Sequence, residues 1–290
     1  MTVAVTAANP ADSGLDEPAA HRHPGLIRVV AGKGRRSRVP RPVRRLTGPL
    51  LLLALWQLGS TTGIIPADVL ASPATVLSSF WHLLTDGELV KALVVSLQRV
   101  VLGLLIGGTI GISLAVIAGL FRLGEDLVDA PVQMLRTVPF VGLIPLLIIW
   151  FGIGETPKIA LVCLGVGFPL YLNVYAGIRN VDGTLVEAAR TLGLSRLGLI
   201  RHVVLPGALP SALVGLRYSL GIAWLALVFA EQINATAGLG YLMNQAREYF
   251  LTDVIVVCLV VYAFLGLTAD LIVRLLERTL LSWRPAFTGS

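Results

Sequence analysis

Long runs without any charged side chain constrain this chain more than any other feature. A helix needs about 20 mostly apolar residues to cross a bilayer. Only 14% of the chain is charged, whereas roughly a quarter is usual for a soluble domain. Four runs contain no Asp, Glu, Lys or Arg, and each is long enough, or nearly so, to span a membrane alone: residues 46–67, 100–121, 137–154 and 159–178.

Two further apolar runs, residues 218–230 and 254–269, are shorter. Each becomes a full span if one charge near its cytoplasmic end, Arg217 or Asp270, is paired or reaches the interface. Counting inward from the helix ends places these two residues at similar depth, so we predict that they form an intramembrane ion pair.

Lysine and arginine predict the orientation, because short loops that carry them stay in the cytoplasm. With the N-terminus inside, 17 loop cations lie on the cytoplasmic side and 3 on the other. We therefore predict an all-α membrane protein with six transmembrane helices and both termini cytoplasmic. The expected parts are a basic, disordered tail over 1–45, a membrane domain over 46–282 and a second tail over 283–290. The expected spans are about 46–66, 98–121, 127–153, 158–178, 212–232 and 253–276.

Several function classes are excluded. The net charge of +6 sits mainly in the tail before Leu46 and beside membrane helices, where anionic lipid explains it better than nucleic acid. The only Gly-Lys pair, Gly32-Lys33, lacks the remaining positions of a phosphate-binding loop. The four histidines are too scattered for a metal site, and no nucleophile and base stand at matching depth. We expect no catalytic centre, no metal and no cofactor in this chain.

The connection from Arg179 to about Ala212 is far longer than neighbouring helices need. Its sequence predicts a short helix, a reversal at Gly193 and a second short helix that ends near Pro206. Glu187 is expected near the start of the first helix, where a carboxylate is favoured and can pair with a cation of a partner. An amphipathic helix lying on the membrane without a partner is the alternative interpretation.

This segment resembles the EAA signature of binding-protein-dependent ABC permeases, in which Glu-Ala-Ala is followed by a glycine six residues after the Glu and by an aliphatic-Leu-Pro ending. The matching positions are Glu187, Ala188, Ala189, Gly193, Leu205 and Pro206. The similarity extends from about Pro49 to Phe287 and is strongest to the aliphatic sulfonate branch of the sulfonate, taurine and nitrate group. Stretches that carry it include residues 133–136, 143–146, 149–154, 177–180, 205–211 and 238–242.

The resemblance implies the type I importer fold in a bacterial plasma membrane. Two permease copies would form a pathway at their interface, two ATPase subunits would bind ATP and Mg below, and an extracytoplasmic binding protein would deliver the cargo. Residues 183–206 would seat in a groove of the ATPase and transmit its closure. The implied cargo is an aliphatic sulfonate, with taurine or nitrate as alternatives. A membrane-embedded enzyme and a structural membrane protein without transport are the alternatives from other classes.

The third expected span suits the wall of a pathway. Pro139 and Pro145 each remove a backbone hydrogen bond, so a kinked helix is expected. Arg136 is predicted near mid-membrane, where an unpaired charge is costly and is a candidate for contact with a passing anion. A structural ion pair with Asp129 is the alternative.

Glu231 and Gln232 stand at the outer end of the fifth expected span. They are predicted either to face the delivered ligand or binding protein, or to form only a polar helix terminus.

Overall fold

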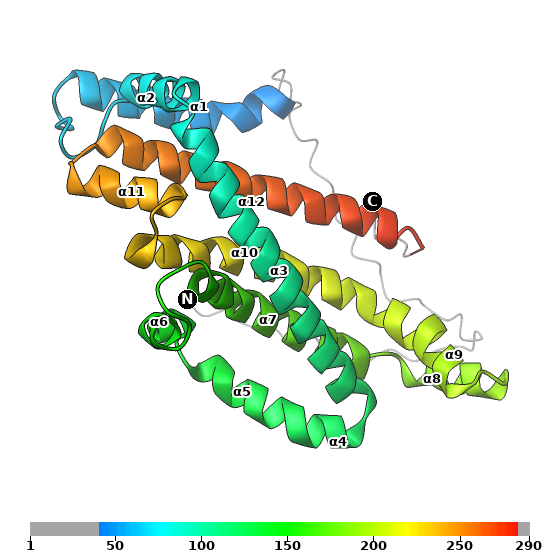
Figure 1. Cartoon of the computed structure of the whole chain (residues 1–290). Coiled ribbons are helices and arrows are strands. Elements are labelled where there is room, and N and C mark those ends of the chain that lie inside the picture. Colours follow the sequence, from blue (N-terminus) through cyan, green and yellow to red (C-terminus); the bar gives the residue numbers. More distant parts are fainter. Residues whose placement is uncertain (1–40, 284–290) are drawn as a thin grey trace, which may run out of the picture. The chain divides into compact units, whose positions relative to one another are not determined.

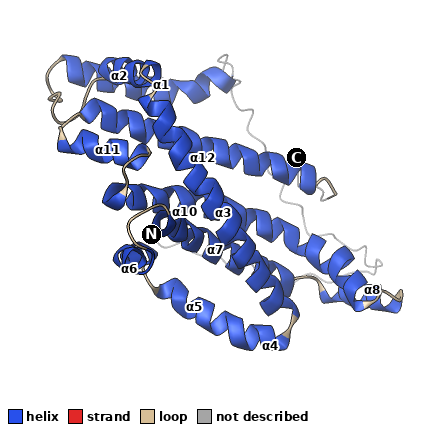
Figure 2. Ribbon diagram, viewed as in Figure 1, coloured by secondary structure: helices blue, strands red, loops and turns tan. Residues whose placement is uncertain are grey.

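The computed structural model describes residues 41–283, so the predicted tails lie almost entirely outside the described residues. The chain divides after Gly48 into two compact units, and all the elements below belong to the second, Pro49–Ser290, except the first residues of α1. Every regular element in the described part is a helix (Figure 2). This confirms the predicted all-α class.

Four helices are long and apolar enough to cross a membrane. They are α3 (Glu88–Leu120), α7 (Thr156–Arg179), α10 (Leu205–Asn234) and α12 (Thr252–Leu280). α3 begins well before the predicted residue 98, because Lys91 and Arg99 interrupt the charge-free run without interrupting the helix. α10 is continued upstream by α9 (Arg196–Leu199) and η3 (Ile200–Val204), so that residues 196–233 form one helix.

The predicted third span is broken rather than kinked. Residues 122–137, made of α4 (Arg122–Gly124), η1 (Glu125–Asp129) and α5 (Ala130–Thr137), lie at 89° to residues 140–151, made of η2 (Phe140–Leu143) and α6 (Ile144–Phe151).

The position of the two prolines explains this break. Val138 is extended, with ψ 127°, as steric clash requires of a residue that precedes proline. Pro145 lies in the first turn of α6, where no helical hydrogen bond is lost. The expected kink at Pro145 was therefore wrong, and the whole bend is made at Val138–Pro139.

α7 lies between α3 and α10 and packs closely against both (Figure 1). Glycines make the approach to α3 possible: a Cβ added at Gly107 would lie 2.7 Å from the Cα of Cys163, and one at Gly111 would lie 2.5 Å from the carbonyl oxygen of Gly167. Gly103, Gly107 and Gly111 recur every four residues, a spacing that predicts close packing of helices, and the structure shows this contact between α3 and α7.

Shorter helices complete the described part. α1 (Arg41–Thr61) covers most of the first predicted span, and α2 (Pro73–Thr85) and α11 (Leu239–Glu248) each precede a long helix. α8 (Gly183–Thr191) begins directly after α7. α1 is not among the four helices that pass the length and hydropathy criteria, and the bent pair is a possible fifth span.

Candidate functional site

A helical hairpin, residues 182–204, occupies the position of the predicted coupling segment. Asp182 caps α8, because its carboxylate accepts hydrogen bonds from the Thr184 backbone N–H at 2.9 Å and hydroxyl at 2.8 Å. These bonds lower the pKa of Asp182. The chain reverses at Gly193, whose φ of +83° is a conformation that favours glycine. Ser195 then caps α9 by accepting from the Gly198 N–H at 3.2 Å.

The hairpin has both buried and exposed residues. Ala189, Leu199 and Val204 are buried in a cluster with residues near the C-terminal end of α7, including Val174 and Ile178. Elsewhere the hairpin exposes Glu187 and Ala188 together with three large apolar side chains, Leu185, Leu192 and Leu197, which are 58%, 81% and 74% exposed. Exposed apolar side chains on a short, anchored hairpin are typical of a protein interaction site.

Three details differ from the sequence expectation. Glu187 is in the second turn of α8 rather than at its start, because Asp182 supplies the cap. Ala189 packs against the chain's own core, so it is not available to a partner. Leu205 and Pro206 lie inside the continuous helix of residues 196–233 instead of ending a short helix, directly after the π-helical segment η3.

Side-chain hydrogen bonds tie the segment before α5 to α7. On α7 the residues Tyr171, Tyr175 and Arg179 are spaced one turn apart. The Tyr171 hydroxyl donates to Asp129 at 2.9 Å, the Tyr175 hydroxyl donates to Glu125 at 2.9 Å, and Arg179 lies 3.3 Å from Glu125. The two tyrosine rings stack at 5.8 Å. We call these five residues the tyrosine ladder.

Arg136, at the end of α5, does not pair with Asp129, which the tyrosine ladder engages. It lies at a pocket of about 410 Å³ between η2, α7 and α10. We call this the arginine pocket, and it is lined by Arg136, Phe140, Gly165, Phe168, Pro169, Leu172, Asn173, Tyr218 and Ile222. Pro139 adjoins the pocket through its neighbour Phe140 but does not line it.

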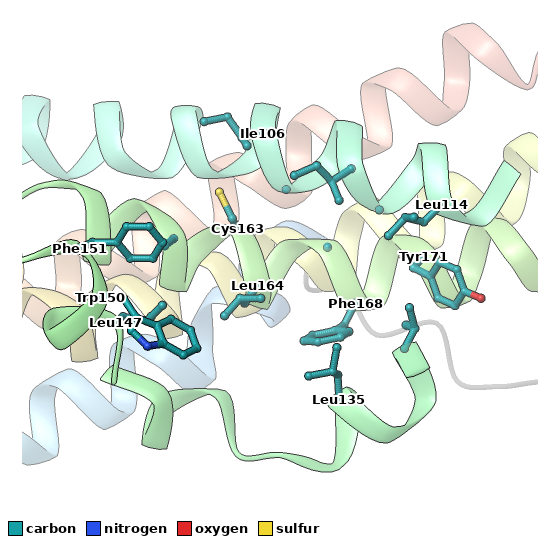
Figure 3. Close-up of a pocket in the computed structure, with 16 residues that line it drawn as sticks. Ile106, Leu114, Leu135, Leu147, Trp150, Phe151, Cys163, Leu164, Phe168 and Tyr171 are labelled. Carbon is teal, nitrogen blue, oxygen red and sulfur yellow. The ribbon is translucent and has the colours of Figure 1, made fainter. Parts of the chain in front are cut away.

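A second pocket of about 500 Å³ lies between α3, α5, α6 and α7 (Figure 3). Leu135, Leu147, Trp150 and Leu164 surround it, and Phe168 borders both pockets. Its surface is almost entirely apolar, because the hydroxyl of Tyr171 is engaged by the tyrosine ladder. Its lining contains no Lys or Arg side chain that could bind an anion.

Glu231 does not face a ligand, and this corrects the prediction. Its side chain is 1% exposed and accepts hydrogen bonds from Arg99 at 2.7 Å, Ser96 at 2.8 Å and the Gly240 N–H at 2.8 Å. The loop after α10 folds back over the carboxylate, which is why Glu231 is covered although Ile233 in the same turn is exposed. Gln232 beside it is partly exposed.

Arg99 is the residue that the sequence reasoning missed. It is 3% exposed, and besides Glu231 it donates to the Ala237 carbonyl at 2.7 Å and to both oxygens of Glu155, at 2.5 and 2.7 Å. These bonds hold the pKa of Glu155 down to about 2. The network joins α3, the connection before α7 and the end of α10.

Arg217 and Asp270 are brought together, with Nε and Oδ1 3.2 Å apart. They are not an isolated pair, because Arg217 also contacts Glu277 at 2.8 Å and Asp270 also contacts Arg274 at 2.7 Å. The four side chains form an alternating chain of charges between α10 and α12.

This chain of charges gives a specific expectation for a charge swap. Arg217→Asp combined with Asp270→Arg keeps the central pair but places an aspartate at position 217 beside Glu277 and an arginine at position 270 beside Arg274. We expect the swap to restore none of the assembly that either single change loses, measured as the yield of monodisperse complex in detergent. A reversal that includes Glu277→Arg and Arg274→Glu should restore part of it. Recovery with the two-residue swap alone would contradict this arrangement.

No group of three or more His, Cys, Asp or Glu side chains in the described residues is placed to hold a metal ion.

The geometry can be compared with known proteins. Residues 107–282 match the family described as binding-protein-dependent transport system inner membrane component. The chain is 51% identical over 239 residues to the putative aliphatic sulfonates transport permease protein SsuC of Escherichia coli strain K12, covering 82% of this chain and 91% of that protein. It is 36% identical over 238 residues to the taurine transport system permease protein TauC of the same strain, covering 80% and 86%.

Among solved structures, the fold is similar to that of an amino acid ABC transporter with histidines. The TM-score is 0.59 at 18% identity, and the match covers 69% of this chain and 98% of that one. At this identity the likeness shows the fold alone.

Proposed function

Because the chain belongs to the family of binding-protein-dependent transport system inner membrane components, we propose that it is the permease subunit of an ATP-driven importer for aliphatic sulfonates. Membership implies an ATPase partner and a binding protein in general. The observation that carries the proposal is the hairpin at residues 182–204, which is anchored by Ala189, Leu199 and Val204 and leaves Glu187, Ala188 and three leucines exposed. The exposed face is where the ATPase would seat.

The finer arrangement is part of the proposal. It has six spans, with α1 as the first and the broken pair as the third, and with both termini in the cytoplasm. Two permease copies assemble with two ATPase subunits, which bind ATP and Mg, and this chain binds no cofactor of its own. The charge distribution supports the orientation, and the exposed hairpin supports the ATPase contact. The cargo assignment draws on the higher identity to the sulfonate permease than to the taurine permease.

Substitution at Gly193 tests the coupling. Gly193→Val forces a β-branched residue to φ +83°, which costs about 1–2 kcal/mol and roughly tenfold in correctly folded hairpin. We expect at least a comparable loss of ATPase co-purification and of ATP-driven uptake, while the variant still reaches the membrane. Glu187→Lys should weaken the same contact without altering the backbone.

Gly183→Ala is the matched control, because a Cβ there meets nothing within 4 Å and the backbone conformation is ordinary. It should co-purify the ATPase as the wild type does. Equal losses in the control and in Gly193→Val would count against the hairpin as the docking element.

Two further measurements test the orientation and the cargo. A cysteine at Ala188, in a chain in which Cys163 and Cys258 are replaced, should react with impermeant thiol reagents only from the cytoplasmic side. Reaction only from outside would overturn the proposal.

A strain that lacks the gene should fail to grow on alkanesulfonates as sole sulfur source. Loss of growth on taurine or on nitrate alone would instead assign one of those cargoes.

A further inference from the structure

The arginine pocket lies near the middle of the membrane. Phe168 and Pro169 stand at the midpoint of α7, and Tyr218 lies close to the midpoint of α10. Both helices are long enough to cross the bilayer, so the pocket is several turns from either end. A side chain that reaches this pocket is far from the interfacial water that surrounds the ends of the helices.

Arg136 is without a carboxylate partner in the part of the chain that the structure describes. Arg99 and Arg217, which also lie within long helices, each contact two carboxylates. A charged side chain at this depth is too costly to face lipid and must meet water or a counter-charge. Carboxylates of the chain therefore neutralise Arg99 and Arg217. The charge of Arg136 must be neutralised by a group from outside the described residues.

The other polar groups of the pocket suit an anion with several oxygens. The guanidinium presents a planar set of donors that binds such groups in a bidentate manner. Tyr218 is exposed and its hydroxyl is a donor. The Asn173 amide uses one of its two hydrogens on the Pro169 carbonyl, at 2.8 Å, and keeps the other.

The remaining wall is apolar. Phe140, Phe168, Leu172 and Ile222 supply apolar lining beside the polar groups. No Asp or Glu lines it, so nothing there balances a positive charge on the cargo.

We propose that the arginine pocket holds the sulfonate group of the cargo in transit, with Arg136 as its anchor, Tyr218 and Asn173 as further donors and the phenylalanine wall against the alkyl chain. This inference rests on the proposed function and adds a specificity to it. An uncharged alkyl chain is favoured over the ammonium group of taurine, because the lining has no carboxylate. It is also favoured over nitrate, which cannot use the apolar wall.

A charge-selective labelling experiment tests the site. Tyr218→Cys is made in the background without Cys163 and Cys258, and the complete importer in membrane vesicles is treated with two methanethiosulfonates of similar size, one with a sulfonate and one with a trimethylammonium group. A full charge within about 8 Å changes the local concentration of a monovalent reagent roughly fivefold at an effective dielectric constant of about 40, in opposite senses for the two reagents.

We therefore expect the anionic reagent to be favoured roughly tenfold or more, relative to a reference cysteine at Ile64, which is 80% exposed in the connection after α1. Arg136→Gln should abolish that preference, and Arg136→Lys should keep most of it. Ethanesulfonate should slow the labelling, and taurine and nitrate should slow it much less. In transport, Arg136→Gln should raise the KM for ethanesulfonate at least tenfold, and Arg136→Lys should raise it less.

The results separate the two proposals. An unchanged reagent preference in Arg136→Gln, or protection by nitrate or taurine but not by ethanesulfonate, would overturn the arginine pocket as the sulfonate site even if the importer takes up sulfonates. If labelling fails because Tyr218→Cys does not assemble, Ile222→Cys, one turn further along α10, supplies the same readout. Failure of Gly193→Val to uncouple uptake would instead contradict the proposed function and leave the labelling result interpretable.

Discussion

Arg99→Met is expected to destabilise the protein by about 3 to 5 kcal/mol, because it leaves Glu231 as a buried carboxylate without its cation. Ser96 and the Gly240 N–H still donate to that carboxylate, but neither neutralises its charge. The change also deprives the Ala237 carbonyl of its donor. The measurement is the midpoint of thermal unfolding of the purified complex in detergent, together with the amount of permease in the membrane.

Two variants make this prediction specific. Glu155→Gln removes the other carboxylate that Arg99 contacts, but that side chain is 55% exposed, so the loss should stay below about 1 kcal/mol. Arg99→Met combined with Glu231→Gln should recover part of the stability, because the amide oxygen still accepts from Ser96 and Gly240 and no charge is left unpaired. If Arg99→Met alone lowered the stability no more than Glu155→Gln does, the buried pair of Arg99 and Glu231 would contribute little to stability.

The contribution of the Glu155 carboxylate to stability also depends on pH. Because Arg99 lowers its pKa from 4.5 to about 2, the folded protein favours the carboxylate. The stability that this provides is complete above about pH 4.5 and is lost as the pH falls toward 2. Glu155→Gln should therefore flatten the stability profile below pH 4.5 and leave it unchanged in shape at neutral pH.

Gly107→Ala is expected to have the second large effect. The added Cβ would overlap the carbonyl oxygen of Cys163 and lie 2.7 Å from its Cα, and backbone atoms cannot turn aside as a side chain does. Helices α3 and α7 would have to separate along their contact, and overpacking of this kind costs about 1 to 3 kcal/mol or more. Lower unfolding temperature and lower yield of assembled complex are the expected readouts.

Gly266→Ala in α12 is the control, because a Cβ at that position meets nothing within 4 Å. Both changes add one methyl group, and both replace glycine by alanine within a helix. The gain in helix propensity is therefore the same in the two variants. If the two variants unfolded at the same temperature, the close contact between α3 and α7 would be contradicted.

The sequence was most informative where local chemistry decides the structure. The spacing of Gly103, Gly107 and Gly111 predicted a helix contact, and the structure shows the backbone of α7 against the last two. Gly193 predicted the reversal inside the hairpin, because only that position needs a positive φ there. Charge-free runs likewise predicted long helices at α3, α7 and α12.

What the sequence did not predict depends on partners far along the chain. Arg99 lies at the edge of the second expected span, and its sequence neighbourhood does not identify its partners, because Glu155 and Glu231 are 56 and 132 residues away. A lone arginine inside an otherwise apolar run, with two carboxylates at the outer ends of other spans, was the available signal. The angle at Val138–Pro139 was underestimated for a similar reason: proline forbids a straight helix, but the packing of α6 against α7 decides how far the chain turns.

The tyrosine ladder and the hairpin contact the same end of α7. Residues 125–129 are held to successive turns of α7 by hydrogen bonds, and the hairpin buries Ala189 and Leu199 against the same part of that helix. The hairpin, the end of α7 and the segment before α5 are therefore joined by direct contacts. α5 continues from this junction to Arg136, and the chain then turns at the extended Val138–Pro139 peptide into α6, which packs against the first half of α7.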